Sequence, residues 1–153
     1  MTIDAAPLQA AVRAVFDESP YSSGTISVAV VDGPTIHAIN RQYLQHDYPT
    51  DVLSFVLEDR EPYLEGELIV STDAASQHAS EYDWSAHNEL LLYVIHGALH
   101  LVGFRDQQPE EIVAMRAAEA EHLRRLNIAL PDGATRWSND TATQKSSSEV
   151  LPS

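Results

Sequence analysis

The stretch AHNELLLYVIHGALHLVGFRD, residues 86–106, decides the fold. As far as residue 101, its side chains are apolar on nearly every side of a helix, which is typical of a helix buried in the core. Ser85 stands directly before the stretch, where its hydroxyl can cap the first turn. Gly103 stands where a residue without Cβ can end the helix in a left-handed turn. We therefore expect a buried helix over residues 86–101.

Two histidines interrupt this apolar helix. His96 and His100 lie four residues apart, so their Cβ atoms share one helix face at a separation of about 5–6 Å. Both imidazoles can then bind one ion at about 2.0–2.1 Å, and buried histidines without partners are costly. Asp106 follows the turn at Gly103, where a carboxylate can close the site. The pattern H-x-x-x-H-x-x-G-x-x-D predicts one divalent metal ion, zinc in the first instance, with other divalent metals left open.

Three protein ligands leave a fourth position for water, the arrangement of catalytic rather than structural zinc sites. The expected chemistry is therefore hydrolysis by a metal-bound water. The pattern resembles that of metzincin proteases, whose third ligand also follows a Gly turn. Zinc proteases, however, carry a glutamate general base directly after the first histidine, and here this position is Gly97. A metzincin-like metalloprotease is thus an alternative that the sequence disfavours.

The other elements follow from apolar periodicity and turn residues. Helices are expected over residues 7–19, 34–44 (capped by Asp32), 72–82 and 109–126, and strands over 24–31, 52–57 and 68–71. The first strand is rich in β-branched residues and is expected to be buried. The last two strands flank a turn-rich segment, residues 59–66, and are expected to be antiparallel neighbours.

The chain is strongly acidic, with 9 Lys and Arg against 23 Asp and Glu and a net charge of −14. This balance argues against non-specific binding to a polyanion, which depends on phosphate neutralisation, and no DNA partner is expected. Between residues 20 and 106 the basic residues are Arg41, Arg60 and Arg105. A nucleic-acid substrate must therefore be held locally, by a metal and a few arginines.

The length of 153 residues fits one domain. We expect it over residues 1–130, with residues 131–153, rich in Ser, Thr, Asn and Asp, as a disordered tail. Cysteine is absent, which excludes disulfides and thiolate metal sites. No apolar run approaches the roughly 20 residues of a membrane span, and the first residues lack a secretory signal pattern. A cytoplasmic protein with no membrane partner is expected.

Three ordered motifs are similar to those of the YbeY family of bacterial metal-dependent endoribonucleases. HGALHLVGF, residues 96–104, resembles the family signature H-G-x-L-H-L-x-G-Y-D-H. INRQYLQHDYPTDVLSF, residues 39–55, is similar to L-N-x-x-Y-R-x-x-D-x-P-T-D-V-L-S-F, and GELIVS, residues 66–71, to G-D-I-x-I-S. The order and spacing agree as well, so the resemblance covers roughly residues 24–125.

The resemblance implies a single zincin-like α+β domain, in which a small mixed β-sheet packs with helices and the metal-binding helix is buried. It also implies a single-strand-specific endoribonuclease for rRNA maturation and ribosome quality control, with the small ribosomal subunit or its assembly factors as partners. Among the departures from the family pattern, its Tyr-Asp aligns with Phe104 and Arg105, its third histidine with Asp106, and its arginine after the aromatic residue with Leu44. If that arginine handles phosphate, Arg41, one turn earlier, is the candidate to replace it.

Further site candidates are fewer and weaker. Glu89, two turns before the first histidine, is a candidate general base, and Arg41 is the other candidate catalytic residue. Asp51 and Ser54 are candidates for substrate contact, or else belong to a turn and the strand core. The charges over residues 119–125 are expected to form a solvated helix face. A third interpretation keeps the metal without catalysis: a ribosome-associated metal-binding protein, favoured by the missing arginine and the acidic surface.

Overall fold

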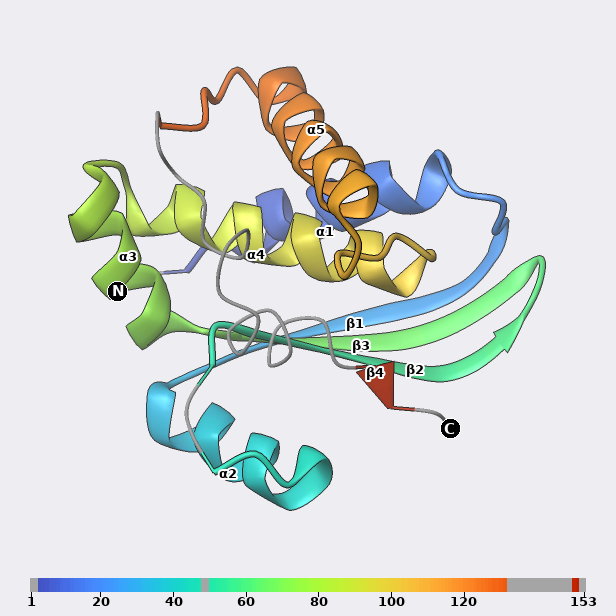
Figure 1. The fold of residues 1–153 in the computed structure, drawn as a ribbon, viewed down its shortest axis with the longest axis horizontal. Coiled ribbons are helices and arrows are strands. Elements are labelled where there is room, and N and C mark those ends of the chain that lie inside the picture. The colour runs from blue at the N-terminus through green and yellow to red at the C-terminus, as the bar shows by residue number, and fades with distance from the viewer. Residues whose placement is uncertain (1–2, 48–49, 132–149, 152–153) are drawn as a thin grey trace.

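The computed structural model describes residues 3–47, 50–131 and 150–151 of the 153-residue chain. It is an α+β fold, as expected, in which helices lie on both faces of a small sheet (Figure 1). In chain order the elements are α1 (Ala5–Asp17), β1 (Ser23–Val31), α2 (Gly33–Leu44), β2 (Val52–Arg60), β3 (Tyr63–Ser71), α3 (Thr72–Tyr82), α4 (Ala86–Leu101), α5 (Pro109–Arg125) and β4 (Val150–Leu151).

The sheet is mixed, with the strand order β1-β3-β2-β4. β2 and β3 are the expected antiparallel neighbours, whereas β1 is parallel to β3 and β4 is parallel to β2. The expected turn over residues 59–66 is wrong, because β2 continues to Arg60 and β3 begins at Tyr63. Leu64 is buried while Glu65 on the next position is only half-buried. The turn between the two strands is therefore limited to Glu61 and Pro62, and Glu65 lies on a strand that alternates between buried and half-buried positions.

The strand over residues 24–31 forms as β1, but the expectation that it is buried is wrong. No residue of β1 is fully buried. β1 is an edge strand with β3 as its neighbour, and a groove of about 620 Å³ remains between it and α1. Its β-branched residues thus fit a strand that the helices cover only in part.

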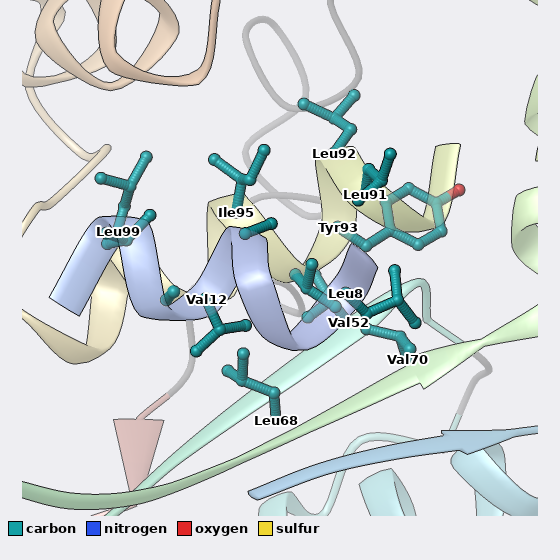
Figure 2. Packing of buried hydrophobic residues seen from close by; sticks show 14 of the residues in the cluster. Leu8, Val12, Val52, Leu68, Val70, Leu91, Leu92, Tyr93, Ile95 and Leu99 are labelled. Carbon is teal, nitrogen blue, oxygen red and sulfur yellow. The ribbon is translucent and has the colours of Figure 1, made fainter. Parts of the chain in front are cut away.

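Helix α4 packs on β2 and β3 and contacts α1, α3 and α5, with α5 on the side away from the sheet (Figure 1). Every residue from Glu89 to Leu101 is buried, which confirms the expected buried helix. Ser85 caps it, with the Asn88 backbone N–H donating to the hydroxyl oxygen at 3.0 Å. The apolar side chains of α4 pack against those of α1, such as Leu8, and of the sheet, such as Leu68 (Figure 2).

Helix α2 covers the opposite face of the sheet (Figure 1). Its residue Ile36 packs with Leu53, Phe55 and Ile69 of β2 and β3 in a second apolar cluster. Asp32 caps α2 as expected, accepting from the Thr35 backbone N–H at 2.8 Å. The sheet therefore separates the residues of α2 from those of α4.

The proposed division of the chain at residue 130 stays a prediction. The expected disordered tail, residues 131–153, falls mostly outside the described residues, although Val150–Leu151 within it pair with β2 as β4. Within the ranges that the structure describes, no helix is long and apolar enough to cross a membrane.

Gly97 is a point of close contact between α4 and the sheet. A Cβ on this residue would lie 2.8 Å from Leu68 Cδ2, 3.1 Å from Ser54 Oγ and 3.2 Å from Val52 Cγ2. The Ser54 hydroxyl also donates to the Gly97 carbonyl oxygen at 3.3 Å. Position 97 therefore faces the sheet, and the packing leaves no room there for a side chain.

Replacement of Gly97 by alanine is expected to destabilise the protein. Overpacking costs about 1–3 kcal/mol, which outweighs the gain of up to about 1 kcal/mol in helix propensity. Thermal unfolding of Gly97→Ala should show a melting temperature lower by about 2–4 °C for each kcal/mol lost. The loss should shrink in a Leu68→Val background, because valine lacks the atom nearest to the new methyl group. A melting temperature at or above that of the parent chain would contradict this packing.

Candidate metal centre

Helix α4 places His96 and His100 on one face, one turn apart, as expected. His96 is 0% and His100 7% exposed. Their rings are 4.5 Å apart between centroids, and their Nε2 atoms are 3.1 Å apart. Two nitrogens bound to one tetrahedral ion at about 2.0–2.1 Å lie about 3.3 Å from each other. The two imidazoles thus have nearly the spacing of two ligands of a single ion.

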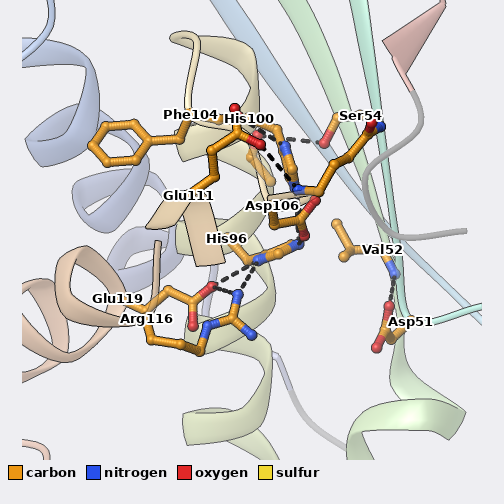
Figure 3. Close-up of polar contacts among 12 residues, drawn as sticks. Asp51, Val52, Ser54, His96, His100, Phe104, Asp106, Glu111, Arg116 and Glu119 are labelled. Carbon is orange, nitrogen blue, oxygen red and sulfur yellow. Dashed lines mark hydrogen bonds and ion pairs between the residues drawn. The ribbon is translucent and has the colours of Figure 1, made fainter. Parts of the chain in front are cut away.

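Asp106 completes the group from the loop after α4. Gly103 adopts φ +114° at the end of the helix, and the Phe104 backbone N–H donates back to the Leu99 carbonyl oxygen at 2.9 Å. This turn brings Asp106 Oδ2 to 3.4 Å from His100 Nε2 and 3.9 Å from His96 Nε2 (Figure 3). The structure therefore brings together all three metal ligands that the sequence pattern predicts.

The outer nitrogen of each imidazole is held by an acceptor. His96 Nδ1 lies 2.7 Å from Glu119 Oε2 (Figure 3), and His100 Nδ1 lies 3.0 Å from the Phe104 carbonyl oxygen. A carboxylate or carbonyl oxygen accepts a hydrogen bond, so Nδ1 is the donor in each ring and Nε2 is left as the nitrogen that can bind a metal. Acceptors behind the ligand histidines are the usual way to orient them for metal binding.

His96 is in the protonation state that a metal requires. Burial lowers its pKa well below the ordinary value, and the neighbouring His100 and Arg116 act in the same direction. Its imidazole is therefore neutral near pH 7. Arg116 lies 2.7 Å from Glu119 and 3.4 Å from His96 Nδ1. Because Arg116 and His96 Nδ1 are both donors, their proximity results from the carboxylate that they share.

The Nε2 atoms of His96 and His100 and the carboxylate of Asp106 are all able to act as acceptors toward a cation. Whether they fit a metal depends on whether the protein supplies them with a donor. Both carboxylate oxygens of Asp106 are buried and have no hydrogen-bond partner within the described part of the chain. The three ligand atoms lie within 4.8 Å of one another. Buried acceptors without a donor are costly, and a divalent cation between them compensates all three. Two imidazole nitrogens and one carboxylate oxygen are a donor set that suits zinc, so the group can bind a metal ion.

The metal centre opens onto a cleft. His100 and Asp106 line a cavity of about 290 Å³, whose other walls include Tyr21, Asp59 and Arg105. The cavity therefore borders two of the three residues that could hold the metal. The arrangement therefore suits a metal that acts on a substrate better than a metal that only braces the fold.

Glu89, the candidate general base, does not reach the metal centre. It lies two turns before His96, about 10 Å along the helix axis. Its carboxylate is fully buried and accepts from Trp84 Nε1 at 2.6 Å, and His78 Nδ1 lies 3.7 Å away. Glu89 belongs to a polar cluster at the start of α4, and this position argues against a role in proton transfer at the metal.

Asp51 and Ser54, the candidate substrate contacts, are both buried. Asp51 Oδ1 accepts from the Val52 backbone N–H at 2.8 Å, at the start of β2. Ser54 links β2 to α4 through its bond to Gly97. Neither residue lines the cleft, so their observed contacts are those of a turn and of strand packing.

Arg41, the candidate replacement for the missing arginine, lies on α2. The sheet stands between α2 and α4 (Figure 1). Arg41 is exposed, and its guanidinium lies 3.9 Å from Asp47. Leu44, at the departing position, packs against the apolar cluster around Ile36. The structure does not bring Arg41 together with the metal ligands.

Glu119 is a site residue that the sequence analysis missed. It was expected on a solvated helix face, but it is 1% exposed and bonds to His96. The signal was present in the spacing, because Met115, Glu119 and Leu123 recur every four residues and share the buried face of α5. A carboxylate in an apolar stripe is rarely buried without a partner, and here the partner is His96, a predicted metal ligand.

The sequence of this chain is similar to those of known proteins over the helices and the loop that carry the metal centre. Residues 2–127 match the family described as Endoribonuclease YbeY. A protein of that name from Rhodopirellula baltica is 49% identical over 125 residues, 80% of this chain and 64% of that protein. Another, from Salinibacter ruber, is 39% identical over 137 residues, which are 84% of this chain and 85% of that protein. A solution structure of a Thermotoga maritima protein, 28% identical, matches 86% of this chain and 91% of its own with a TM-score of 0.57.

Each ligand histidine is expected to be required for stoichiometric metal. His96→Ala and His100→Ala should each leave the purified, dialysed chain without a bound ion, because the two remaining groups do not form a closed site. Elemental analysis of untagged protein measures this directly. His87→Ala should retain one ion per chain, since His87 lies near the start of the same helix, away from the three ligands.

The variant Glu119→Gln tests whether Glu119 positions His96 for metal binding without binding the metal itself. Glutamine keeps the size of the side chain but loses the charge behind His96, so the metal affinity should fall about 10- to 100-fold without being abolished. Retention of a full equivalent of metal by both the His96→Ala and the His100→Ala chains would contradict the site.

Proposed function

The chain belongs to the YbeY family of endoribonucleases, and on that premise we propose that it hydrolyses single-stranded RNA with one metal ion held by His96, His100 and Asp106. The observation that carries the proposal is the convergence of three buried acceptors beside an open cleft. We propose zinc as the ion, and rRNA maturation together with ribosome quality control as the role.

The residues around the metal centre orient its two histidines, and a cleft lies beside His100 and Asp106. When bound, a divalent ion supplies a water of lowered pKa and polarises a phosphoryl oxygen. Glu119 and the Phe104 carbonyl oxygen hold the outer nitrogens of the two histidines, so that both imidazoles are turned with Nε2 toward Asp106. Asp106 supplies the one negative charge of the ligand set, where the family pattern has a third histidine. Arg116 balances the charge of Glu119.

The protease alternative is further disfavoured by the packing of position 97. The general base of a metzincin would have to follow His96 directly. Here this position is Gly97, and a Cβ would lie 2.8 Å from Leu68 Cδ2 of the sheet. A side chain at this place would point into the core, so the usual proton acceptor for peptide hydrolysis has no equivalent.

The acidic character of the chain bears on its partners. With a net charge of −14, general electrostatic attraction to rRNA is not available. We therefore propose that contacts to the small ribosomal subunit or to its assembly factors, in the cytoplasm, bring the protein to its substrate. A single strand suits the cleft, because its bases and phosphates can enter without deformation of a duplex.

The proposed activity is tested by incubating the purified chain with labelled single-stranded RNA, with duplex RNA of the same sequence, and with casein. Metal-dependent cleavage is expected for single-stranded RNA alone, with loss of cleavage after chelation and in His96→Ala, because the ligand set is then empty or incomplete. Hydrolysis of casein would favour the protease. No cleavage of either RNA by metal-loaded protein would favour the non-catalytic ribosome-associated interpretation.

A further inference from the structure

We propose that Arg105 binds a phosphate of the RNA strand in the cleft beside the metal centre. The substrate class rests on the proposed function. The position rests on the structure, because Arg105 directly precedes the ligand Asp106 and lines the same cleft as His100. Arg105 therefore lines the cleft from which a phosphodiester would approach the metal centre.

The loop that carries Arg105 is held on both sides. Before it, Phe104 accepts from His100 Nδ1 at 3.0 Å and donates to the Leu99 carbonyl oxygen at 2.9 Å. After it, the backbone N–H groups of Gln107 and Gln108 donate to the Glu111 carboxylate at 3.3 and 2.8 Å. The backbone at position 105 is therefore fixed relative to the metal ligands, while the side chain is exposed.

Within the described residues, Arg105 is also a cation that forms no ion pair with a carboxylate. Most arginines of the described ranges are ion-paired, namely Arg41, Arg60, Arg116, Arg124 and Arg125. Arg105 and Arg13 make no ion pair or hydrogen bond within those ranges. Arg13 lines the separate groove between α1 and β1. Among the residues that the structure describes, Arg105 is thus the cation that the cleft presents to a ligand.

The charge of the cleft explains why a phosphodiester needs this cation. Tyr21 and Asp59 also line the cleft, and the Tyr21 hydroxyl donates a hydrogen bond to Asp59 Oδ1 at 2.7 Å. This bond to the carboxylate raises the pKa of Tyr21 to about 12, so the phenol stays protonated. Asp59 and Asp106 both carry carboxylates that would repel a phosphodiester. A guanidinium binds phosphate with two parallel hydrogen bonds, and Arg105 is placed to offset the repulsion.

Arg105 can supply the phosphate contact for which the family motifs leave no arginine in this chain. Leu44 stands where the family pattern has arginine, and Arg41 lies across the sheet from α4. Arg105 instead lines the cleft beside the metal centre, on the loop that carries Asp106. The guanidinium acts on the substrate and not on the metal, so its removal should leave the metal content of the protein unchanged.

The test compares Arg105→Ala and Arg105→Lys with Arg13→Ala, which removes the same charge from an exposed arginine outside the cleft. Cleavage of a labelled single-stranded RNA by the zinc-loaded chain gives KM and kcat. Binding of the same RNA in chelator, where cleavage stops, gives the dependence of the association constant on salt. Arg105→Ala should raise KM about tenfold and make the slope of log K against log salt shallower by about 0.7, the value of one phosphate contact on a single strand. Arg105→Lys should keep the slope, and Arg13→Ala should change neither quantity.

The experiment distinguishes failure of the proposed nuclease activity from failure of the proposed phosphate contact of Arg105. If the parent chain cleaves RNA with metal but Arg105→Ala matches Arg13→Ala in KM and in salt slope, Arg105 does not bind phosphate while the nuclease stands. If the parent chain cleaves no RNA, the proposed function fails, and the salt slope in chelator still decides whether Arg105 contacts the strand. Loss of metal from Arg105→Ala would overturn the inference, since it would make Arg105 a support of the metal site.

Discussion

The structure depends on the placement of three buried acceptors at one point. The Nε2 atoms of two imidazoles of α4 lie 3.1 Å apart, and a carboxylate without a hydrogen-bond partner in the described chain lies beside them. Without a cation such a group would oppose folding. The surrounding elements hold it nevertheless: the sheet packs against Gly97, α5 supplies Glu119, and the turn at Gly103 returns Asp106.

The parts of this site that are local in sequence could be predicted. Apolar residues on every side of residues 86–101 indicate burial, and the spacing of His96, His100 and Asp106 follows from one helix and one turn. Glu119 could not be found in the same way, because its distance to His96 is set by the packing of α5 on α4. Glu89 was proposed as the base from its helix face alone, and its two turns of separation exclude direct contact with the metal.

The fold shows the same division between local and long-range information. The caps Ser85 and Asp32 and the helices that they begin could be predicted from short patterns. The burial of β1 could not, since apolar composition does not reveal that a strand lies at the edge of the sheet. The face on which α2 lies is also a property of topology, and it decides that Arg41 is remote from the centre while Arg105 is beside it.

The central claim is that a divalent metal compensates the three buried acceptors, and thermal unfolding with and without metal tests it most directly. An ion that binds the folded chain stabilises it by about 2.7 kcal/mol at one hundred times its dissociation constant, or about 5–10 °C for a chain of this size. Chelation should therefore lower the melting temperature, zinc should restore it, and Asp106→Asn should reduce the difference. Superimposable melting curves for chelated and zinc-loaded protein would contradict the account.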